Sequence, residues 1–108
     1  MKRHKIGEFR HRLQLEQSAT VPDGGGGYTI SWNVIDTVWA VMAPISGEER
    51  LLADALSGRV THRITVRHRR DLKPSMRLRQ DDRIFEIRAV LDAYPYSPLV
   101  CLCEERPL

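Results

Sequence analysis

Apolar and polar residues alternate along much of this chain, which is the pattern of β-strands that bury one face. Residues 10–17 are a clear case, because Leu13 and Leu15 alternate with polar neighbours. The same alternation is found in 59–67 and 83–91. Further strand-like stretches are 28–32, 34–45, 76–79 and 99–103. Together these stretches predict about six strands.

The most apolar stretch, residues 34–45, is apolar on both faces. One face would carry Val38, Ala40 and Met42, and the other Trp39, Val41, Ala43 and Ile45. Such a strand is either central in a closed barrel or packed between the core and a partner subunit. Pro44 has no N–H to donate, so we expect the ladder pairing to end there.

Residues 46–58 differ from the rest and predict one short helix between strands. Ser46 and Glu49 have the spacing of a capping box, and Gly58 would close the helix. About ten residues do not stay helical alone in water. The helix therefore needs a docking surface, either on its own barrel or on a neighbouring subunit.

Residues 18–27 interrupt the strand pattern and end in four consecutive glycines. Glycine runs are unfavourable inside a helix or a strand, so this segment predicts a mobile hairpin tip. A phosphate-binding P-loop is not indicated. The glycines are followed by strand-like residues rather than by Lys-Ser/Thr and a helix.

The alternation also predicts which side chains of two later strands face the core. In 59–67 these are Val60, His62, Ile64 and Val66. In 83–91 they are Phe85, Ile87, Ala89 and Leu91. With one helix between strands, the predicted fold class is mainly β, a small antiparallel β-barrel of about six strands with one short inserted α-helix. A length of 108 residues predicts a single domain over 1–108.

The outer face of 59–67 would carry Arg59, Arg63 and Arg67. These arginines could hold phosphate groups or pair with acidic side chains on a partner. The alternative is a solvated face balanced by nearby acidic residues, namely Asp81, Asp82 and Glu86. The whole chain has 17 basic and 14 acidic residues, a small excess for a dedicated nucleic-acid-binding protein.

No catalytic, metal or cofactor site is predicted. Cys101 and Cys103 are the only cysteines, and their spacing predicts reduced thiols that face the core. The four histidines do not have the spacing of metal ligands. Asp81 and Asp82 form a carboxylate pair in a predicted turn, where adjacent side chains point apart. No apolar run is long enough to cross a bilayer, and no signal peptide is apparent, so we expect synthesis in the cytosol.

A series of short motifs runs in order across nearly the whole chain. They are Ile6-Gly7, Arg10-His11-Arg12, Trp32, Val38-Trp39-Ala40, Pro44-Ile45-Ser46-Gly47-Glu48, Thr61-His62-Arg63-Ile64-Thr65-Val66-Arg67, Ser75-Met76-Arg77, Phe85-Glu86-Ile87 and Leu102-Cys103-Glu104. In order and spacing this series resembles the head–tail joining (head–tail adaptor) family of tailed bacteriophages. The four-glycine tip and residues 94–98 depart from the family pattern.

The resemblance implies a small β-barrel protomer that assembles into a ring beneath the portal of a DNA-filled capsid. Such rings join head to tail, and in some relatives a loop projects inward and holds DNA until ejection. By position, 46–58 is the first candidate for a channel-facing or subunit-bridging insert, and 18–30 is the second. The expected partners are copies of the chain, the portal or adaptor ring and tail-completion proteins, with transient contact to packaged DNA. No membrane partner is expected.

We therefore expect a non-enzymatic structural subunit of a phage, prophage or gene-transfer-particle connector, located in the virion and assembled in the host cytoplasm. The candidate subunit-interface residues are Trp32, Trp39, Val41, Leu51, Leu52 and Leu56. Arg59, Arg63 and Arg67 would contact an acidic neighbour, with DNA as second choice. The alternatives are a stand-alone small β-barrel nucleic-acid-binding protein and a small hydrolase that uses Asp81 or Asp82.

Overall fold

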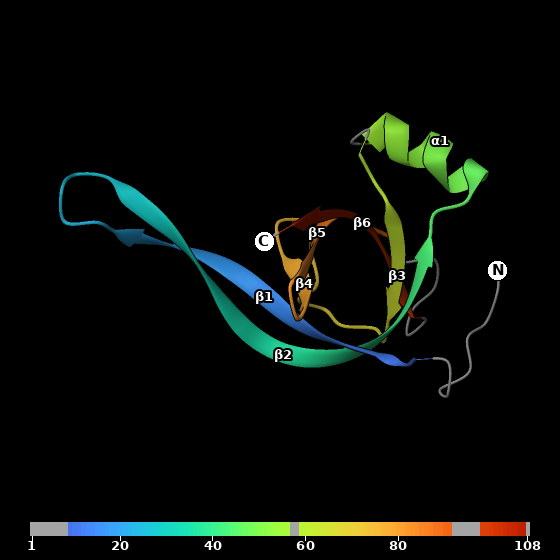
Figure 1. The fold of residues 1–108 in the computed structure, drawn as a ribbon, viewed down its shortest axis with the longest axis horizontal. Helices are drawn as coiled ribbons and strands as arrows, with labels where there is room; N and C mark the ends of the chain where they lie inside the picture. The colour runs from blue at the N-terminus through green and yellow to red at the C-terminus, as the bar shows by residue number, and fades with distance from the viewer. Residues whose placement is uncertain (1–8, 57–58, 92–97, 108) are drawn as a thin grey trace.

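The computed structural model describes residues 9–56, 59–91 and 98–107. Six strands and one helix are formed there. They are β1 (His11–Pro22), β2 (Tyr28–Pro44), α1 (Gly47–Leu56), β3 (His62–Val66), β4 (Arg77–Gln80), β5 (Arg83–Leu91) and β6 (Leu99–Pro107). The predicted strands are all present, and α1 is the inserted helix (Figure 1).

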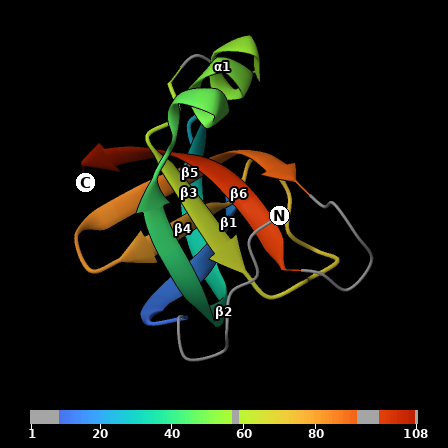
Figure 2. The ribbon, with the colours of Figure 1, turned by 90° about the vertical axis from the view of Figure 1, so that its right-hand side faces the viewer.

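The six strands close into a barrel in the order β1-β2-β3-β6-β5-β4. Every neighbouring pair is antiparallel, and β4 returns to β1 to complete the circuit. Figure 2 looks toward the side of the barrel that carries α1. The predicted fold class, a small antiparallel β-barrel with one inserted helix, is confirmed. Closure leaves the barrel without an unpaired sheet edge.

The core fills the inside of this barrel with side chains from all six strands. Its largest fully buried members include Phe85, Leu13, Leu15, Ile64 and Leu78. The predicted inner face of 34–45 is also confirmed, because Ala40 is fully buried and Val38 and Met42 pack against the same cluster.

A bulge in β5 changes the predicted alternation there. Ile87 pairs with Cys103 and Ala89 with Leu102, so Arg88 is an extra residue on β5. Phe85 and Ile87 face the core as predicted, but the bulge reverses the faces beyond it. Val90 packs against the core instead of Ala89, and Leu91 is exposed, so the prediction was wrong for the last part of this strand.

A second, smaller apolar cluster lies on the outer side of β6. Leu102 alternates with two core cysteines and therefore points outward, where it packs with Val60. Ala89, Ile45 and Val100 join this cluster. Val60 was predicted to share a face with Ile64. It does not, because β3 begins only at His62 and Val60 lies in the connection from α1.

The β1–β2 hairpin extends far beyond the barrel as a two-stranded arm (Figure 1). Pairing of β1 with β4 stops at Glu16, whereas pairing of β1 with β2 continues to Pro22 and Tyr28. The arm gives the molecule its long dimension, with extents of 51 × 29 × 27 Å. The predicted hairpin tip was therefore too long, because Ser18–Pro22 belong to β1.

The tip itself is a turn organised by Asp23. Its carboxylate Oδ1 accepts hydrogen bonds from the N–H groups of Gly25 and Gly27, at 2.8 and 3.0 Å. Gly24 and Gly26 have φ values of 84° and 87°, which side chains other than glycine rarely adopt. The bonds from Gly25 and then Gly27 hold the pKa of Asp23 below its ordinary value. The glycine run thus serves a specific turn.

The helix α1 stands apart from the strands (Figure 2). Its first internal bond joins the N–H of Arg50 to the carbonyl of Ser46, at 2.9 Å. The Arg50 guanidinium donates a second bond, also of 2.9 Å, to the carbonyl of Val60. This bond ties the helix to the chain that enters β3. The side chain of Glu49, the predicted capping partner of Ser46, lies outside the described residues.

Candidate assembly surfaces

The base of the arm is held by an ion pair between neighbouring strands. Nε of Arg77 on β4 lies 2.6 Å from Oε1 of Glu16 on β1, and the Glu16 side chain is only 4% exposed. The Arg77 guanidinium also lies 4.1 Å from the centre of the Trp32 ring on β2. Trp32, predicted as a subunit-interface residue, is thus half-buried in an intramolecular cation–π contact.

One face of the arm is apolar and open to solvent. Tyr28 and Ile30 lie on the same side of β2, two residues apart, with exposures of 72% and 67%. The other side of the hairpin carries mainly small polar residues, together with the exposed Val21. An exposed apolar strip on a projecting hairpin is typical of a protein-contact surface.

The outward side of α1 is both acidic and apolar. Leu51 has an exposure of 74%, and Glu48, Asp54 and Ala55 are also exposed. Their spacing places these four residues along one side of the helix. Leu52 and Leu56, the other predicted interface residues of the helix, have side chains outside the described residues.

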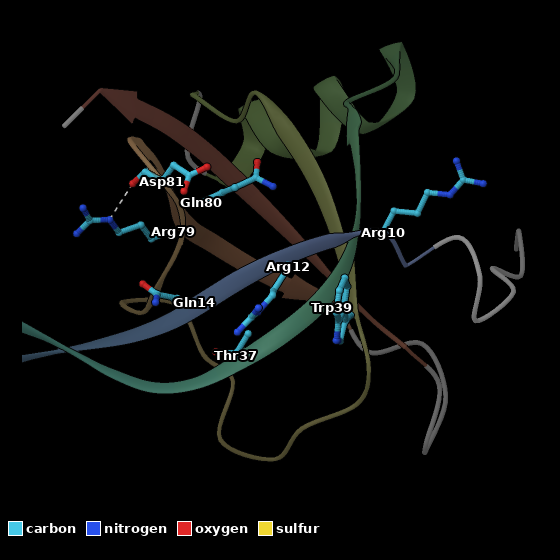
Figure 3. Close-up of a pocket in the computed structure, with 8 residues that line it drawn as sticks. All are labelled: Arg10, Arg12, Gln14, Thr37, Trp39, Arg79, Gln80 and Asp81. Carbon is cyan, nitrogen blue, oxygen red and sulfur yellow. Dashed lines mark hydrogen bonds between the residues drawn. The ribbon is translucent and has the colours of Figure 1, made fainter.

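A depression of about 640 Å³ lies on the outer surface of β1, β2 and β4 (Figure 3). It is built from facing residues: Arg12 pairs with Trp39 across β1 and β2, and Gln14 lies between Thr37 and Arg79. Its full lining is Arg10, Arg12, Gln14, Thr37, Trp39, Arg79, Gln80 and Asp81. Three arginines against one aspartate make this surface basic.

Trp39 brings apolar area to the depression. It has an exposure of 54% and points away from the core, opposite to Ala40. Val41, the next predicted interface residue on this face, is half-buried. The outer face of 34–45 is therefore partly exposed to solvent. This is the exposure expected in an isolated subunit for a strand that packs against a partner.

The three arginines predicted to form one charged face are spread along the chain around β3. Arg63 lies within β3 and is half-buried, while Arg59 precedes the strand and Arg67 follows it, both exposed. Glu86 is not their counter-charge, because it pairs with Arg88 and Arg106 at 3.0 and 3.3 Å. Of the three acidic residues in the alternative interpretation, Glu86 is thus engaged by other arginines.

The carboxylate that senses Arg59 is Glu104 on β6. A hydrogen bond from Arg88 is the main reason why the pKa of Glu104 lies below its ordinary value, and Arg106 and Arg59 add smaller effects. Arg88, Arg106, Glu86 and Glu104 form one network across β5 and β6. The charges on this outer surface of the barrel are therefore paired within the chain.

The cysteines lie inside the barrel as predicted. Cys101 and Cys103 are both fully buried and free. Burial raises the pKa of the Cys101 thiol to about 12 and raises that of Cys103 as well. Neither thiol is a nucleophile at neutral pH.

His62 lies at the edge of the core. Its Nδ1 is 2.9 Å from the Thr61 hydroxyl, and its ring meets that of Phe85 edge-on, with centres 5.3 Å apart. Within residues 9–56, 59–91 and 98–107, no three His, Cys, Asp or Glu side chains gather as metal ligands would. The described helix is too short and too polar to cross a membrane.

Two features of the surface were missed in the sequence. The depression combines side chains from three strands, so it depends on a register that alternation alone does not reveal. The pairing of Arg69 was the other omission: its guanidinium donates two bonds of 2.9 Å to Asp71 and also binds Asp36 on β2. The Arg-x-Asp spacing of 69 and 71 was the available signal.

One family model and two solved structures are similar to this chain. The family model described as "Phage head completion protein" matches residues 4–106. A chain from the virion of a native gene transfer agent particle is 28% identical, with a TM-score of 0.61 over 92% of this chain and 96% of that one. Protein SF1141 from Shigella flexneri 2a, solved in solution, is 25% identical, with a TM-score of 0.75 over 94% and 96% of the two chains. No curated protein matches.

The match covers nearly every residue that forms the barrel, the arm and the helix. It agrees with the resemblance that the sequence motifs indicated. A structural role in the head–tail connector is supported by the family and by the virion neighbour, and a stand-alone nucleic-acid-binding role is not. The chain belongs to the phage head completion protein family.

Proposed function

We propose that this chain, acting as a single domain over 1–108, closes into a ring of identical copies between the portal and the tail-side proteins of a phage-like particle. The observation that carries the proposal is the family match over residues 4–106. The gene transfer agent neighbour adds support, because that chain is part of a virion. The particle itself would be the final location, and the host cytoplasm the site of assembly.

The distribution of exposed apolar residues favours self-association. The barrel closes on itself, yet Tyr28, Ile30, Trp39 and Leu51 remain open to solvent on the arm, the barrel wall and the helix. Residues of this kind in several separate places suit a subunit with more than one neighbour. Copies on either side, together with rings above and below, would cover them.

Two projections offer different contacts to the particle. In this proposal α1, within 46–58, bridges to a neighbouring subunit, and the arm, within 18–30, reaches toward another ring or toward the channel. Arg59, Arg63 and Arg67 contact acidic side chains of a neighbour, and packaged DNA touches the ring transiently. No residue has a catalytic role, in keeping with a family of structural proteins.

Electron microscopy of purified particles tests the proposal directly. We expect a symmetric ring of this chain between the head and the tail. Particles made without the chain should accumulate as DNA-filled heads that lack tails, while particles with the restored chain should be complete. Absence of the chain from complete particles would exclude the proposed function.

A further inference from the structure

We propose that the acidic, leucine-bearing side of α1 on one copy docks into the basic depression of β1, β2 and β4 on the next copy. The inference deepens the proposed function, on which it rests, by naming the contact that makes the ring. It joins two surfaces that lie on different parts of the same molecule.

Two arginines of the depression, Arg12 and Arg79, take part in none of the ion pairs found among residues 9–56, 59–91 and 98–107. Among the described residues, the ion pairs include Arg69, Arg77, Arg83, Arg88 and Arg106. Within the described part of the chain, Arg79 donates one hydrogen bond in the depression, from Nε to the carbonyl of Asp81, at 2.9 Å, and this bond is not an ion pair. An acidic partner would supply the missing counter-charges.

The depression also has an aromatic wall. Trp39 is 54% exposed directly beside Arg12, its cross-strand neighbour. Aromatic and arginine side chains together are the residue types that most often anchor protein interfaces. The occupant should therefore offer both carboxylates and an apolar side chain at close spacing.

The outward side of α1 has this composition. Leu51 is 74% exposed and lies between Glu48 and Asp54, which are also exposed. The only basic residue of the helix, Arg50, is bound to the Val60 carbonyl of its own chain. The charge that α1 offers to a partner is thus negative, and its leucine matches the tryptophan of the depression.

The backbone of α1 stands apart from the barrel strands (Figure 2). All extensive contacts between described elements are between strands, and none involves α1. A ten-residue helix without a docking surface is marginal in water. The depression of the next copy would provide a docking surface for α1. The depression of the first copy would in turn receive α1 from the copy on its other side.

The two surfaces are different, so the contact is head-to-tail. Figure 3 shows α1 at one end of the barrel and the depression on the wall formed by β1 and β2. A head-to-tail contact repeats from copy to copy and generates a ring when the rotation closes. A like-to-like contact would instead stop at a dimer.

Charge reversal tests the contact in the purified full-length protein by sedimentation at low salt. The depression variant is Arg12→Glu with Arg79→Glu, and the helix variant is Glu48→Arg with Asp54→Arg. Each alone should weaken self-association by about tenfold or more. An equal mixture should recover self-association with the two variants alternating, because the intact helix meets the intact depression and the two charge-reversed surfaces also complement each other. A chain with all four substitutions should recover self-association.

Cross-linking in the particle tests the same contact where the ring is complete. A chain with both Leu51→Cys and Thr37→Cys should give a ladder of covalent multimers on oxidation. Chains with either cysteine alone should not. A chain with Leu51→Cys and Thr29→Cys, which places the second thiol on the arm, is the matched control. The buried native cysteines do not interfere.

The outcomes separate this inference from the proposed function. Particles that contain the chain in a ring but give no ladder would overturn the helix–depression contact and leave the ring intact. Sensitivity to reversal of the depression but not of the helix would also overturn it and would assign the arginines to another partner, such as DNA. Absence of the chain from particles would overturn both.

Discussion

The barrel and its two projections are built on different principles. In the barrel, six strands satisfy one another and a buried cluster fills the interior. In the arm and α1, short-range hydrogen bonds are made, but large apolar side chains such as Tyr28 and Leu51 remain exposed. The barrel is therefore stable through its own contacts, and the projections are shaped for contacts with other molecules. In a connector subunit the barrel provides a rigid frame, and the arm and α1 provide contact surfaces for other subunits.

Hydrogen exchange should show the widest difference between the two regions. In the free protein, amides of β3 and β6 should exchange only through global unfolding, at a cost of about 5–15 kcal/mol. Amides of 18–30 and 46–58 should exchange orders of magnitude faster, because local opening suffices. NMR or mass spectrometry measures both. Slow exchange in both projections would show that they are packed parts of an autonomous domain.

Truncation of a core side chain should cost far more stability than truncation on the arm. Phe85 is fully buried, so Phe85→Ala should lower the free energy of unfolding by about 3–5 kcal/mol. Ile30, with an exposure of 67%, is the matched control, and Ile30→Ala should change it by less than about 0.5 kcal/mol. Urea denaturation provides the measurement. Equal losses would mean that the arm folds as part of the core.

The ion pair at the base of the arm should behave as part of the barrel. Glu16→Ala leaves the Arg77 guanidinium, whose side chain is 15% exposed, without its counter-charge, at a cost of about 3 kcal/mol. The more exposed pair of Arg83 and Glu105 is the control, and Glu105→Ala should cost less than about 1 kcal/mol. A loss at Glu16 no larger than that at Glu105 would show that the arm base is not fixed by this pair.

The tip should respond to pH in a small and local way. The pKa of Asp23 lies below its ordinary value because Gly25 and Gly27 donate to the carboxylate. The two hydrogen bonds to the Asp23 carboxylate therefore stabilise the turn at pH values above the pKa of Asp23 in the unfolded chain. This stabilisation is lost as the pH falls through the lower pKa of Asp23 in the folded chain. NMR shifts of the two glycine amides should titrate below the normal aspartate range, and Asp23→Asn should abolish the transition. Titration at or above the normal range would contradict the turn.

Strand-like stretches in the sequence identified every strand of the described residues, and alternation failed where the backbone departs from regular pairing. Leu13, Leu15, Phe85 and Ile87 face the core as expected. Beyond Ile87 the bulge at Arg88 reverses the faces, and sequence periodicity carries no signal for one extra residue. Fold class is thus readable from local patterns, whereas the exact face of a residue depends on the partner strand.

The assembly surfaces were predictable only in part, for a related reason. Trp39 stands out in the sequence because it lies on the second apolar face of 34–45, and Leu51 because it lies on a short helix that needs a docking surface. The arginines of the depression do not, because Arg12 and Arg79 are 67 positions apart and are brought together by the pairing of Gln14 with Arg79. Which residues of different strands lie side by side on a surface depends on the register of strand pairing. This register is known only once the structure is known.

The stacking of Arg77 between Glu16 and Trp32 has a mechanical consequence. Bending the arm at its root would pull apart a buried charge pair and an aromatic contact, so the hairpin should tilt together with the barrel as a stiff lever. Because the arm extends along the 51 Å dimension, a slight rotation of the subunit displaces Gly24–Gly27 more than any other part. A small rotation of the barrel would thereby become a large displacement of the arm tip.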